Sequence, residues 1–297
     1  MHAPTLLLDG LAFPEGPRWR GDWLWFSDVT DKRVMRVDVE GHREVVATLD
    51  DRPSGLGFLP DGSLLVVAMT QRRLLRLFNG RIEPYADLRE FGGDFANDMV
   101  VDGDGRAYVG IRSTQLRPGF ALPPEGDEPD VVVAVEPSGE MSIAADHLVS
   151  PNGTVITPDG RTLIVAETYA HRVTAYDRAA DGTLTGRRVF AGVDSTYPDG
   201  ICLDDAGGVW IGSPYTDEVI RVVVGGQVTD RISLPGGVAC ALGGSDGRTL
   251  FMLCVDPAAL PKPGTTANAT RVLHGTVTFD QGRIWTMSVA HAGAGWP

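Results

Sequence analysis

The sequence predicts an all-β, six-bladed propeller, because one unit recurs six times and each copy consists of two apolar runs joined by a turn. The clearest copy spans residues 197–212, where a Pro-Asp-Gly opening leads into an apolar run, an acidic glycine-rich turn and a second apolar run. Corresponding positions in successive copies lie 39, 44, 54, 47 and 40 residues apart. A four-stranded blade takes about 40–50 residues, so the spacing indicates six blades.

The repeated unit predicts the first two strands of every blade. Asp-Gly and similar turns separate the two apolar runs, and such turns are a strong hairpin signal. The six copies occupy residues 13–27, 52–68, 95–110, 150–166, 197–212 and 237–253.

Further strands are predicted after the copies, because several runs alternate polar and apolar side chains. In the first five blades these runs are residues 33–38, 73–77, 131–135, 172–176 and 218–222. Residues 274–278 and 282–287 are expected to be outer strands of the last blade, which residues 5–8 complete. Pairing of the two chain ends would close the ring and remove exposed sheet edges. Residues 1–297 are therefore expected to form a single propeller domain.

Composition argues against several other classes of protein. The net charge is −13 and there is no basic patch, which disfavours binding of nucleic acid. No run approaches the roughly 18 apolar residues of a membrane span, and the N-terminus lacks the pattern of a signal peptide. Cys202, Cys240 and Cys254 lie in apolar runs and are expected to be buried thiols of a reducing compartment. These observations predict a cytoplasmic protein, and a closed propeller predicts a monomer.

One repeated position carries most of the polar side chains that could do chemistry. It is occupied by Glu15, Ser54, Asp98, Asn152, Asp199 and Ala239. Each residue is expected to precede the first strand of its blade, so the six would converge near one mouth of the central channel. Carboxylate and amide oxygens there favour Ca²⁺, Mg²⁺ or Mn²⁺ and leave Zn²⁺ possible. Alternatively, the Asp and Asn residues only form turns, although Glu15 is not a typical turn residue.

The same residues carry a family resemblance. Residues 13–19 (FPEGPRW), Asn97-Asp98, residues 150–153 (SPNG) and residues 197–200 (YPDG) are similar to signatures of the SMP-30/gluconolactonase/LRE-like (regucalcin) family. The tail, residues 292–297, also resembles that of many bacterial members. The resemblance covers essentially the whole chain. It implies a six-bladed propeller that holds one divalent metal ion at the channel mouth and typically hydrolyses lactones, often of sugar acids.

Site roles follow from this resemblance, residue by residue. Glu15, Asn152 and Asp199 match the three protein ligands of the metal ion, which is expected to be Ca²⁺ before Mg²⁺, Mn²⁺ or Zn²⁺. Asn97 matches a residue that contacts substrate or metal-bound water. Asp199 is also the candidate general base, because it could bind the ion and still reach a water molecule. Asp98 could support the metal ligands or could simply hydrogen-bond its own turn.

The chain departs from the family pattern where substrate is expected to bind. Sugar-lactonase members have an arginine at the position of Phe95, and their acidic contact corresponds to Gln115, with Arg112 nearby. The differences at these three substrate-binding candidates predict a lactone or ester that is less polar than a sugar-acid lactone.

Two long loops are candidates for covering the mouth. Residues 112–130 explain the longest repeat spacing and are rich in proline and glycine, so they are expected to form either a lid or an irregular surface loop. Residues 257–268 are proline-rich and could flank the same mouth.

Three functions fit the sequence. The first is a metal-dependent hydrolase that opens a small-molecule lactone or ester. The second is a non-catalytic propeller that binds a divalent ion or a protein partner. The third is a non-hydrolytic enzyme, such as a lyase, on the same scaffold. Metal-stimulated turnover of a lactone would distinguish the first from the second.

Overall fold

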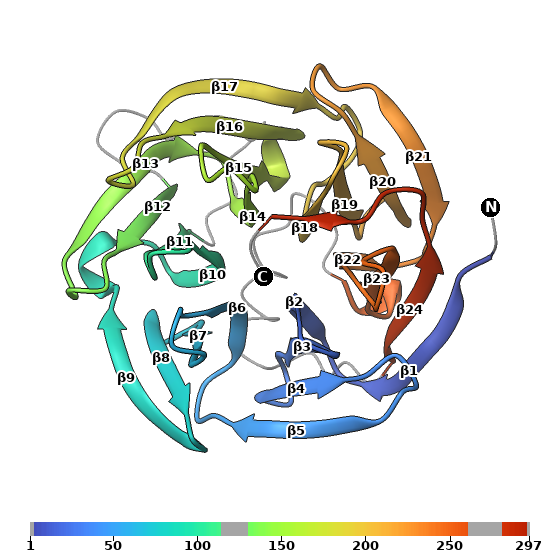
Figure 1. The fold of residues 1–297 in the computed structure, drawn as a ribbon, viewed down its shortest axis with the longest axis horizontal. Helices are drawn as coiled ribbons and strands as arrows, with labels where there is room; N and C mark the ends of the chain where they lie inside the picture. Colours follow the sequence, from blue (N-terminus) through green and yellow to red (C-terminus); the bar gives the residue numbers. More distant parts are fainter. Residues whose placement is uncertain (1–2, 114–129, 261–280, 296–297) are drawn as a thin grey trace.

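Six antiparallel β-sheets are arranged around a common axis in the computed structural model, which describes residues 3–113, 130–260 and 281–295 (Figure 1). The predicted all-β, six-bladed propeller is therefore confirmed. Short 3-10 helices interrupt the strands at Arg89–Phe91, Thr168–Ala170 and Pro257–Ala259. No helix in these ranges is long and apolar enough to span a membrane.

The innermost strand of each sheet comes from the first apolar run of the repeat. These strands are β2 (Pro14–Arg20), β6 (Pro53–Phe58), β10 (Phe95–Val101), β14 (Pro151–Ile156), β18 (Ile201–Asp204) and β22 (Gly237–Gly243). The second run forms the neighbouring strands β3 (Trp23–Asp28), β7 (Leu64–Ala68), β11 (Ala107–Arg112), β15 (Thr162–Glu167), β19 (Val209–Ser213) and β23 (Thr249–Cys254).

Two outer strands complete each blade. The third strands are β4 (Arg33–Val37), β8 (Arg73–Phe78), β12 (Asp130–Val135), β16 (Arg172–Arg178), β20 (Glu218–Val222) and β24 (Gly282–Ser288). The fourth strands are β5 (Arg43–Thr48), β9 (Arg81–Asp87), β13 (Met141–Leu148), β17 (Leu184–Gly192), β21 (Val228–Ser233) and β1 (Thr5–Leu11). The third strands agree with the alternating runs in the sequence, and the predicted strand at residues 274–278 lies outside the described residues.

The ring closes through the N-terminal strand, as predicted. β1 pairs antiparallel with β24, with Leu6 opposite Trp285, and becomes the outermost strand of the sixth blade (Figure 1). A short strand near the other chain end, β25 (Gly293–Ala294), pairs with β18 of the fifth blade. Pairing at both ends leaves fewer open sheet edges.

Apolar side chains fill the space between neighbouring blades. Between the sixth and first blades, for example, Leu24 and Phe26 pack with Phe251 and Leu253. All four side chains are fully buried. Burial of apolar area in these layers is the main stabilising contribution to the fold.

The innermost strands are irregular where the repeated polar position falls. Strands β2, β6, β10, β14 and β22 each show a register shift against their neighbour within the first few residues. A β-bulge of this kind re-aims a side chain and is common beside functional sites. The repeated position thus lies within the innermost strand in five blades, and only Asp199 precedes its strand as the sequence suggested for all six.

Candidate functional site

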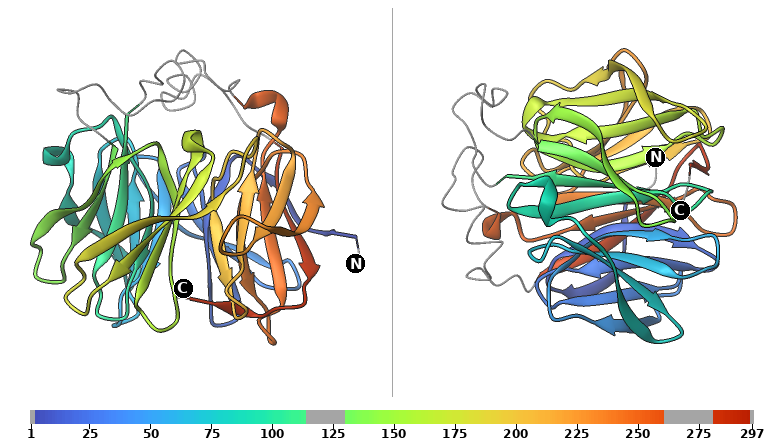
Figure 2. Two further views of the ribbon diagram at one scale, coloured as in Figure 1. Left: turned by 90° about the horizontal axis from the view of Figure 1, so that it is seen from above. Right: turned by 90° about the vertical axis from the view of Figure 1, so that its left-hand side faces the viewer.

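A cavity of about 150 Å³ lies where the six blades meet, and Arg112 and Leu260, beside two points where the described chain breaks off, are among its lining residues. The blades surround the axis on which it lies, as the side views of the ring show (Figure 2). Every blade contributes to it from two places. The starts of the inner strands supply Phe13, Glu15, Arg52, Ser54, Phe95, Asn97, Asn152, Asp199 and Val238. The ends of the second strands supply Val29, Met69, Arg112, Thr168, Tyr169, Pro214, Tyr215 and Leu260.

The cavity brings together the metal-ligand candidates Glu15, Asn152 and Asp199, which come from the first, fourth and fifth blades. The substrate candidates Phe95, Asn97 and Arg112 line the same cavity. Gln115 lies outside the described residues, as do most of the lid candidate at residues 112–130 and part of the loop at residues 257–268.

The two carboxyl groups in the cavity resist ionisation. Burial raises the pKa of Glu15 well above its usual value, and repulsion from Asp199 and Asp98 raises it further. Burial also raises the pKa of Asp199 from 3.8 to about 7, against the opposing effect of the Arg112 guanidinium. Both residues are only half-buried, because part of each faces the cavity. Two acids with raised pKa values in one cavity are typical of a site that a cation or a proton completes.

A chain of hydrogen bonds fixes the amide of Asn152. The Thr168 hydroxyl donates to the carbonyl oxygen of Pro198 at 2.7 Å, so its oxygen is left to accept from Asn152 Nδ2 at 3.1 Å. Asn152 Oδ1 must then face the other way, where it accepts from Asn97 Nδ2 at 2.9 Å. One lone pair of this oxygen remains available to a cation.

The same chain continues around the axis into the first three blades. Ser54 Oγ donates to Asn97 Oδ1 at 3.4 Å, and Ser27 Oγ donates to the Ser54 carbonyl oxygen at 2.6 Å. Side chains on four blades and the backbone of the fifth are therefore linked, and neither of the two asparagine amides can rotate freely. This network positions the polar atoms of the cavity before any ligand binds.

Asp98 does not line the cavity, although the sequence placed it at the repeated position. Its Oδ1 accepts from Arg18 at 3.2 Å and from the Met99 backbone at 2.8 Å, and its neighbour Asn97 faces the cavity instead. Likewise Val238, not Ala239, lines the cavity in the sixth blade. The register shift at the start of each strand explains both one-residue differences.

An apolar wall occupies the side of the cavity near Arg112. Phe13, Val29, Met69 and Phe95 line this part, and three of them form one packed cluster with Phe13 against it. The Arg112 guanidinium carbon lies 5.3 Å from the centre of the Phe95 ring. The site therefore combines oxygen ligands with apolar contact area, as small-molecule sites commonly do.

Several lining residues were not identified as site candidates from the sequence. They include Ser54, Thr168, Tyr169 and Tyr215. For the last three of these a signal was present in the sequence. Each follows the second strand of its blade by one or two residues, close to the position of Arg112 at the end of the second strand of the third blade. Tyr215 packs edge-on against Tyr197, with ring centres 5.1 Å apart.

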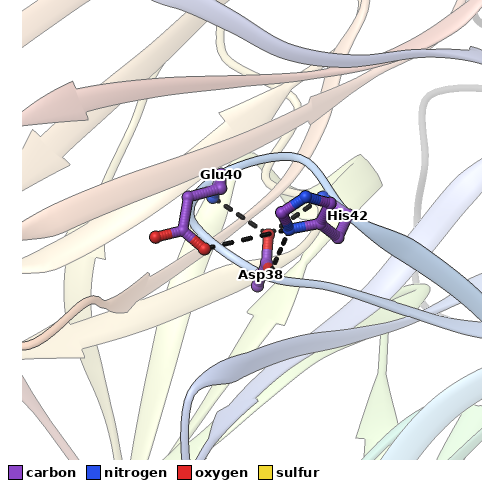
Figure 3. A group of neighbouring side chains, drawn as sticks. All are labelled: Asp38, Glu40 and His42. Carbon is purple, nitrogen blue, oxygen red and sulfur yellow. Dashed lines mark hydrogen bonds and ion pairs between the residues drawn. The ribbon is translucent and has the colours of Figure 1, made fainter.

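A second group of possible metal ligands lies on the surface, in the turn between β4 and β5. Atoms of Asp38, Glu40 and His42 lie within 4.8 Å of one another (Figure 3). Asp38 Oδ1 accepts from the backbones of Glu40 and His42 at 2.9 Å each, and Asp38 Oδ2 is 2.8 Å from His42 Nδ1. These contacts satisfy the hydrogen-bonding groups of an exposed turn, and nothing else among the described residues at this position indicates a ligand.

The cavity fits a hard divalent cation better than this surface turn does. Glu15 and Asp199 supply charge, Asn152 supplies an oriented amide oxygen, and the two acids repel each other without a cation. Oxygen-only ligands suit Ca²⁺, Mg²⁺ or Mn²⁺ more than Zn²⁺.

Comparisons with known proteins agree with this architecture. The chain is 27% identical to pentonolactonase XacC of Haloferax volcanii, over 80% of each chain. It is also 27% identical to 6-deoxy-6-sulfogluconolactonase of Pseudomonas putida, over 80% of this chain and 81% of the relative. A solved structure of a calcium-binding regucalcin from Agrobacterium tumefaciens superposes with a TM-score of 0.77 at 20% identity, covering 99% and 96% of the two chains. The relatives thus include lactonases.

The family assignment rests on most of the chain. Residues 13–255 match the sequence profile of the SMP-30/Gluconolactonase/LRE-like region, and this range contains every described residue of the cavity except Leu260. The chain belongs to the SMP-30/gluconolactonase/LRE-like family.

Proposed function

We propose that this chain is a divalent-metal-dependent hydrolase that opens a small-molecule lactone. The observation that carries the proposal is the convergence of Glu15, Asn152 and Asp199 from three blades in one partly apolar cavity. Two lactonases whose sequences match this chain over 80% of its length support the reaction class.

Glu15, Asn152 and Asp199 would hold the cation, and Ca²⁺ is the first choice because all three ligands are hard oxygens. When bound, such an ion polarises a carbonyl oxygen and lowers the pKa of a water molecule. Asp199 would act as general base, since its carboxylate has a second oxygen that could accept a proton from the attacking water. Asn97, held by Ser54 and Asn152, would orient the substrate or this water.

The proposed substrate is less polar than a sugar-acid lactone. Phe95, Met69 and Val29 present carbon atoms where a polyhydroxylated ring would need hydrogen-bond partners. Burying unpaired hydroxyl groups there costs free energy, so an alkyl-substituted or aromatic lactone ring is favoured.

We infer further that the chain works as one propeller domain, as a monomer in the cytoplasm. The closed ring of paired strands supports the first two inferences. The free cysteines Cys202, Cys240 and Cys254 support a reducing compartment.

The test is turnover of γ-, δ- and aromatic lactones after removal of metal and refilling with Ca²⁺, Mg²⁺, Mn²⁺ or Zn²⁺. We expect metal-dependent opening of the less polar lactones, reduced about a hundredfold or more by Glu15→Gln and by Asp199→Asn. Asp38→Asn, in the surface turn, should leave turnover unchanged. If metal stabilises the protein but no lactone is opened, the cavity binds a cation without this chemistry and the proposal fails.

A further inference from the structure

Arg112 places a positive charge in the cavity, and no described residue forms an ion pair or hydrogen bond with its guanidinium. The residue ends β11 opposite Phe95 on β10, and its guanidinium lies over the Phe95 ring. Arg112 lines the same cavity as Glu15 and Asp199 and lowers the pKa values of both. It is close enough to act on them electrostatically, yet within the described residues it forms no ion pair with either.

The unpaired guanidinium distinguishes Arg112 from other arginines with buried atoms. Its Nε is buried and has no hydrogen-bond partner among residues 3–113, 130–260 and 281–295. Arg33 and Arg72 also have an unpartnered Nε, but their terminal nitrogens bind Asp28 and the backbone of Gly92 and Gly93. No such bond involves any guanidinium nitrogen of Arg112 in the part of the chain that the structure describes. Buried donors are normally satisfied, so a ligand is the expected partner.

A count of charges indicates the sign of that ligand. A bound divalent cation would balance Glu15 and Asp199. Asp98 is paired with Arg18. Arg52, which also lines the cavity, lies beside the opposite charge of Asp51, which raises the Arg52 pKa against the larger lowering effect of burial. Among the described lining residues, Arg112 is then the one whose charge remains unbalanced, and it favours a singly charged anion.

The size and lining of the cavity limit what carries this charge. Its volume of about 150 Å³ favours a compact ligand such as a single ring. A guanidinium matches the planar fork of a carboxylate. Next to Arg112 the wall is apolar, through Phe95, Met69 and Val29.

We propose that the substrate is a single-ring lactone that bears one carboxylate, with Arg112 binding this carboxylate and Phe95 packing against the ring. The inference rests on the proposed lactonase function and narrows its substrate class: the ring bears no hydroxyl groups, in keeping with the apolar wall, and the carboxylate is its one charged substituent. Arg112 is thereby a specificity-determining residue, and the hydrolysis product would be a hydroxy-dicarboxylate.

Binding of a ligand that cannot be hydrolysed tests the proposal separately from catalysis. The probes are 3-oxocyclopentane-1-carboxylate, a carbocyclic analogue of a carboxylated γ-lactone, and its neutral carboxamide. Calorimetry on the full chain, with Ca²⁺ and without metal, should show the carboxylate binding roughly ten- to a hundredfold more tightly than the carboxamide. Arg112→Met should abolish this preference, and Arg112→Lys should retain part of it.

Arg20→Met is the matched control, because the Arg20 guanidinium also lies over a phenylalanine ring, Phe58, at 4.4 Å, but outside the cavity. This variant should keep the preference for the carboxylate. Equal affinities of the wild-type protein for the two probes would overturn the proposal. So would an equal loss of both affinities in Arg112→Met, which would assign Arg112 to positioning of the metal ligands or to general packing.

Turnover separates this inference from the proposed function. With 5-oxotetrahydrofuran-2-carboxylate and its methyl ester as substrates, Arg112→Met should raise KM for the carboxylate much more than KM for the methyl ester. A loss of kcat on both would contradict carboxylate recognition and indicate stabilisation of the reacting carbonyl instead. If the carboxylate probe binds through Arg112 but neither lactone is opened, the anion site stands and the hydrolase proposal fails.

Discussion

Individual side chains of the cavity are held in place by neighbours that do not touch the expected ligand. Asn152 shows this best, since Thr168 on one side and Asn97 on the other determine which way its amide oxygen points. The short sequence motif around Asn152 predicted an oxygen ligand. It could not predict Thr168, because that contact depends on where the next strand ends.

Removing the Thr168 hydroxyl tests this orientation. Thr168→Val keeps the shape but removes the acceptor for Asn152 Nδ2, so the amide can turn its nitrogen towards the cation. We expect affinity for Ca²⁺ to fall about ten- to a hundredfold, as for other residues that orient metal ligands. Thr174→Val, which removes another buried hydroxyl of the same blade, should leave Ca²⁺ affinity unchanged. Equal affinities in both variants, measured by calorimetry, would show that the orientation is unimportant.

The raised pKa values of Glu15 and Asp199 predict how stability depends on pH. In the metal-free folded protein these acids hold protons that the unfolded chain releases. Their contribution therefore favours the folded state at low pH and is lost as the pH rises from about 4 towards the Asp199 pKa of about 7. A cation competes with these protons, so the rise in Tm caused by Ca²⁺ should be larger at pH 8 than at pH 5.

Asp199→Asn should make this Ca²⁺-induced rise small at both pH values, because one of the two charged ligands is lost. A calcium effect on the wild-type Tm that is equal at pH 5 and pH 8 would contradict the coupling between protons and cation.

At the scale of the strand, the site depends on how closely the inner strands approach each other. A glycine follows Asn152 and Asp199 because neighbouring backbone leaves no space for a side chain. A Cβ atom on Gly153 would lie 2.5 Å from the Ile201 nitrogen, and one on Gly200 would lie 2.4 Å from the Ala239 Cβ. Close packing of these strands brings the ligands of separate blades within reach of one ion.

Gly153→Ala should force β14 and the Asp199 segment apart. We expect a loss of about 1–3 kcal/mol in the free energy of unfolding from overpacking, together with weaker binding of Ca²⁺. Gly192→Ala is the control, because a Cβ atom there meets nothing within 4 Å. Urea unfolding and calorimetry on both variants would measure the two effects. Unchanged Ca²⁺ affinity in Gly153→Ala would show that strand spacing does not determine the site.

The sequence predicted strands better than it predicted the exact position of side chains on them. The repeat predicted both inner strands of each blade, because hairpins are encoded locally by turn residues and apolar runs. It misplaced the cavity residue by one at Asp98 and Ala239, because a β-bulge shifts the register and is not visible in the apolar pattern. Arg112 and Phe95 were chosen from the family resemblance, and their mutual contact is a property of strand pairing.

For the whole molecule, the main requirement is closure of the ring. β1 comes from one end of the chain and β24 from near the other, so the sixth blade is complete only when they pair. The cavity draws residues from all six blades, and its geometry therefore depends on a contact far from it.

Leu11→Ala tests the importance of closure. Leu11 is 1% exposed and packs in the cluster that joins the sixth and first blades. We expect a loss of about 2–5 kcal/mol in the free energy of unfolding. Leu6→Ala on the same strand, where the side chain is 43% exposed, should cost within about 0.5 kcal/mol. Similar urea midpoints for the two variants would mean that the N-terminal strand contributes little to stability.

The location of a bound divalent cation tests the central claim most directly. Crystals grown at pH 8 and soaked in MnCl₂ would be measured at a wavelength where manganese scatters anomalously. The account predicts one strong anomalous peak in the cavity, coordinated by Glu15, Asn152 and Asp199, and no such peak in Glu15→Gln crystals. A peak only at the surface turn of Asp38, Glu40 and His42, or no peak at all, would contradict the proposed metal site.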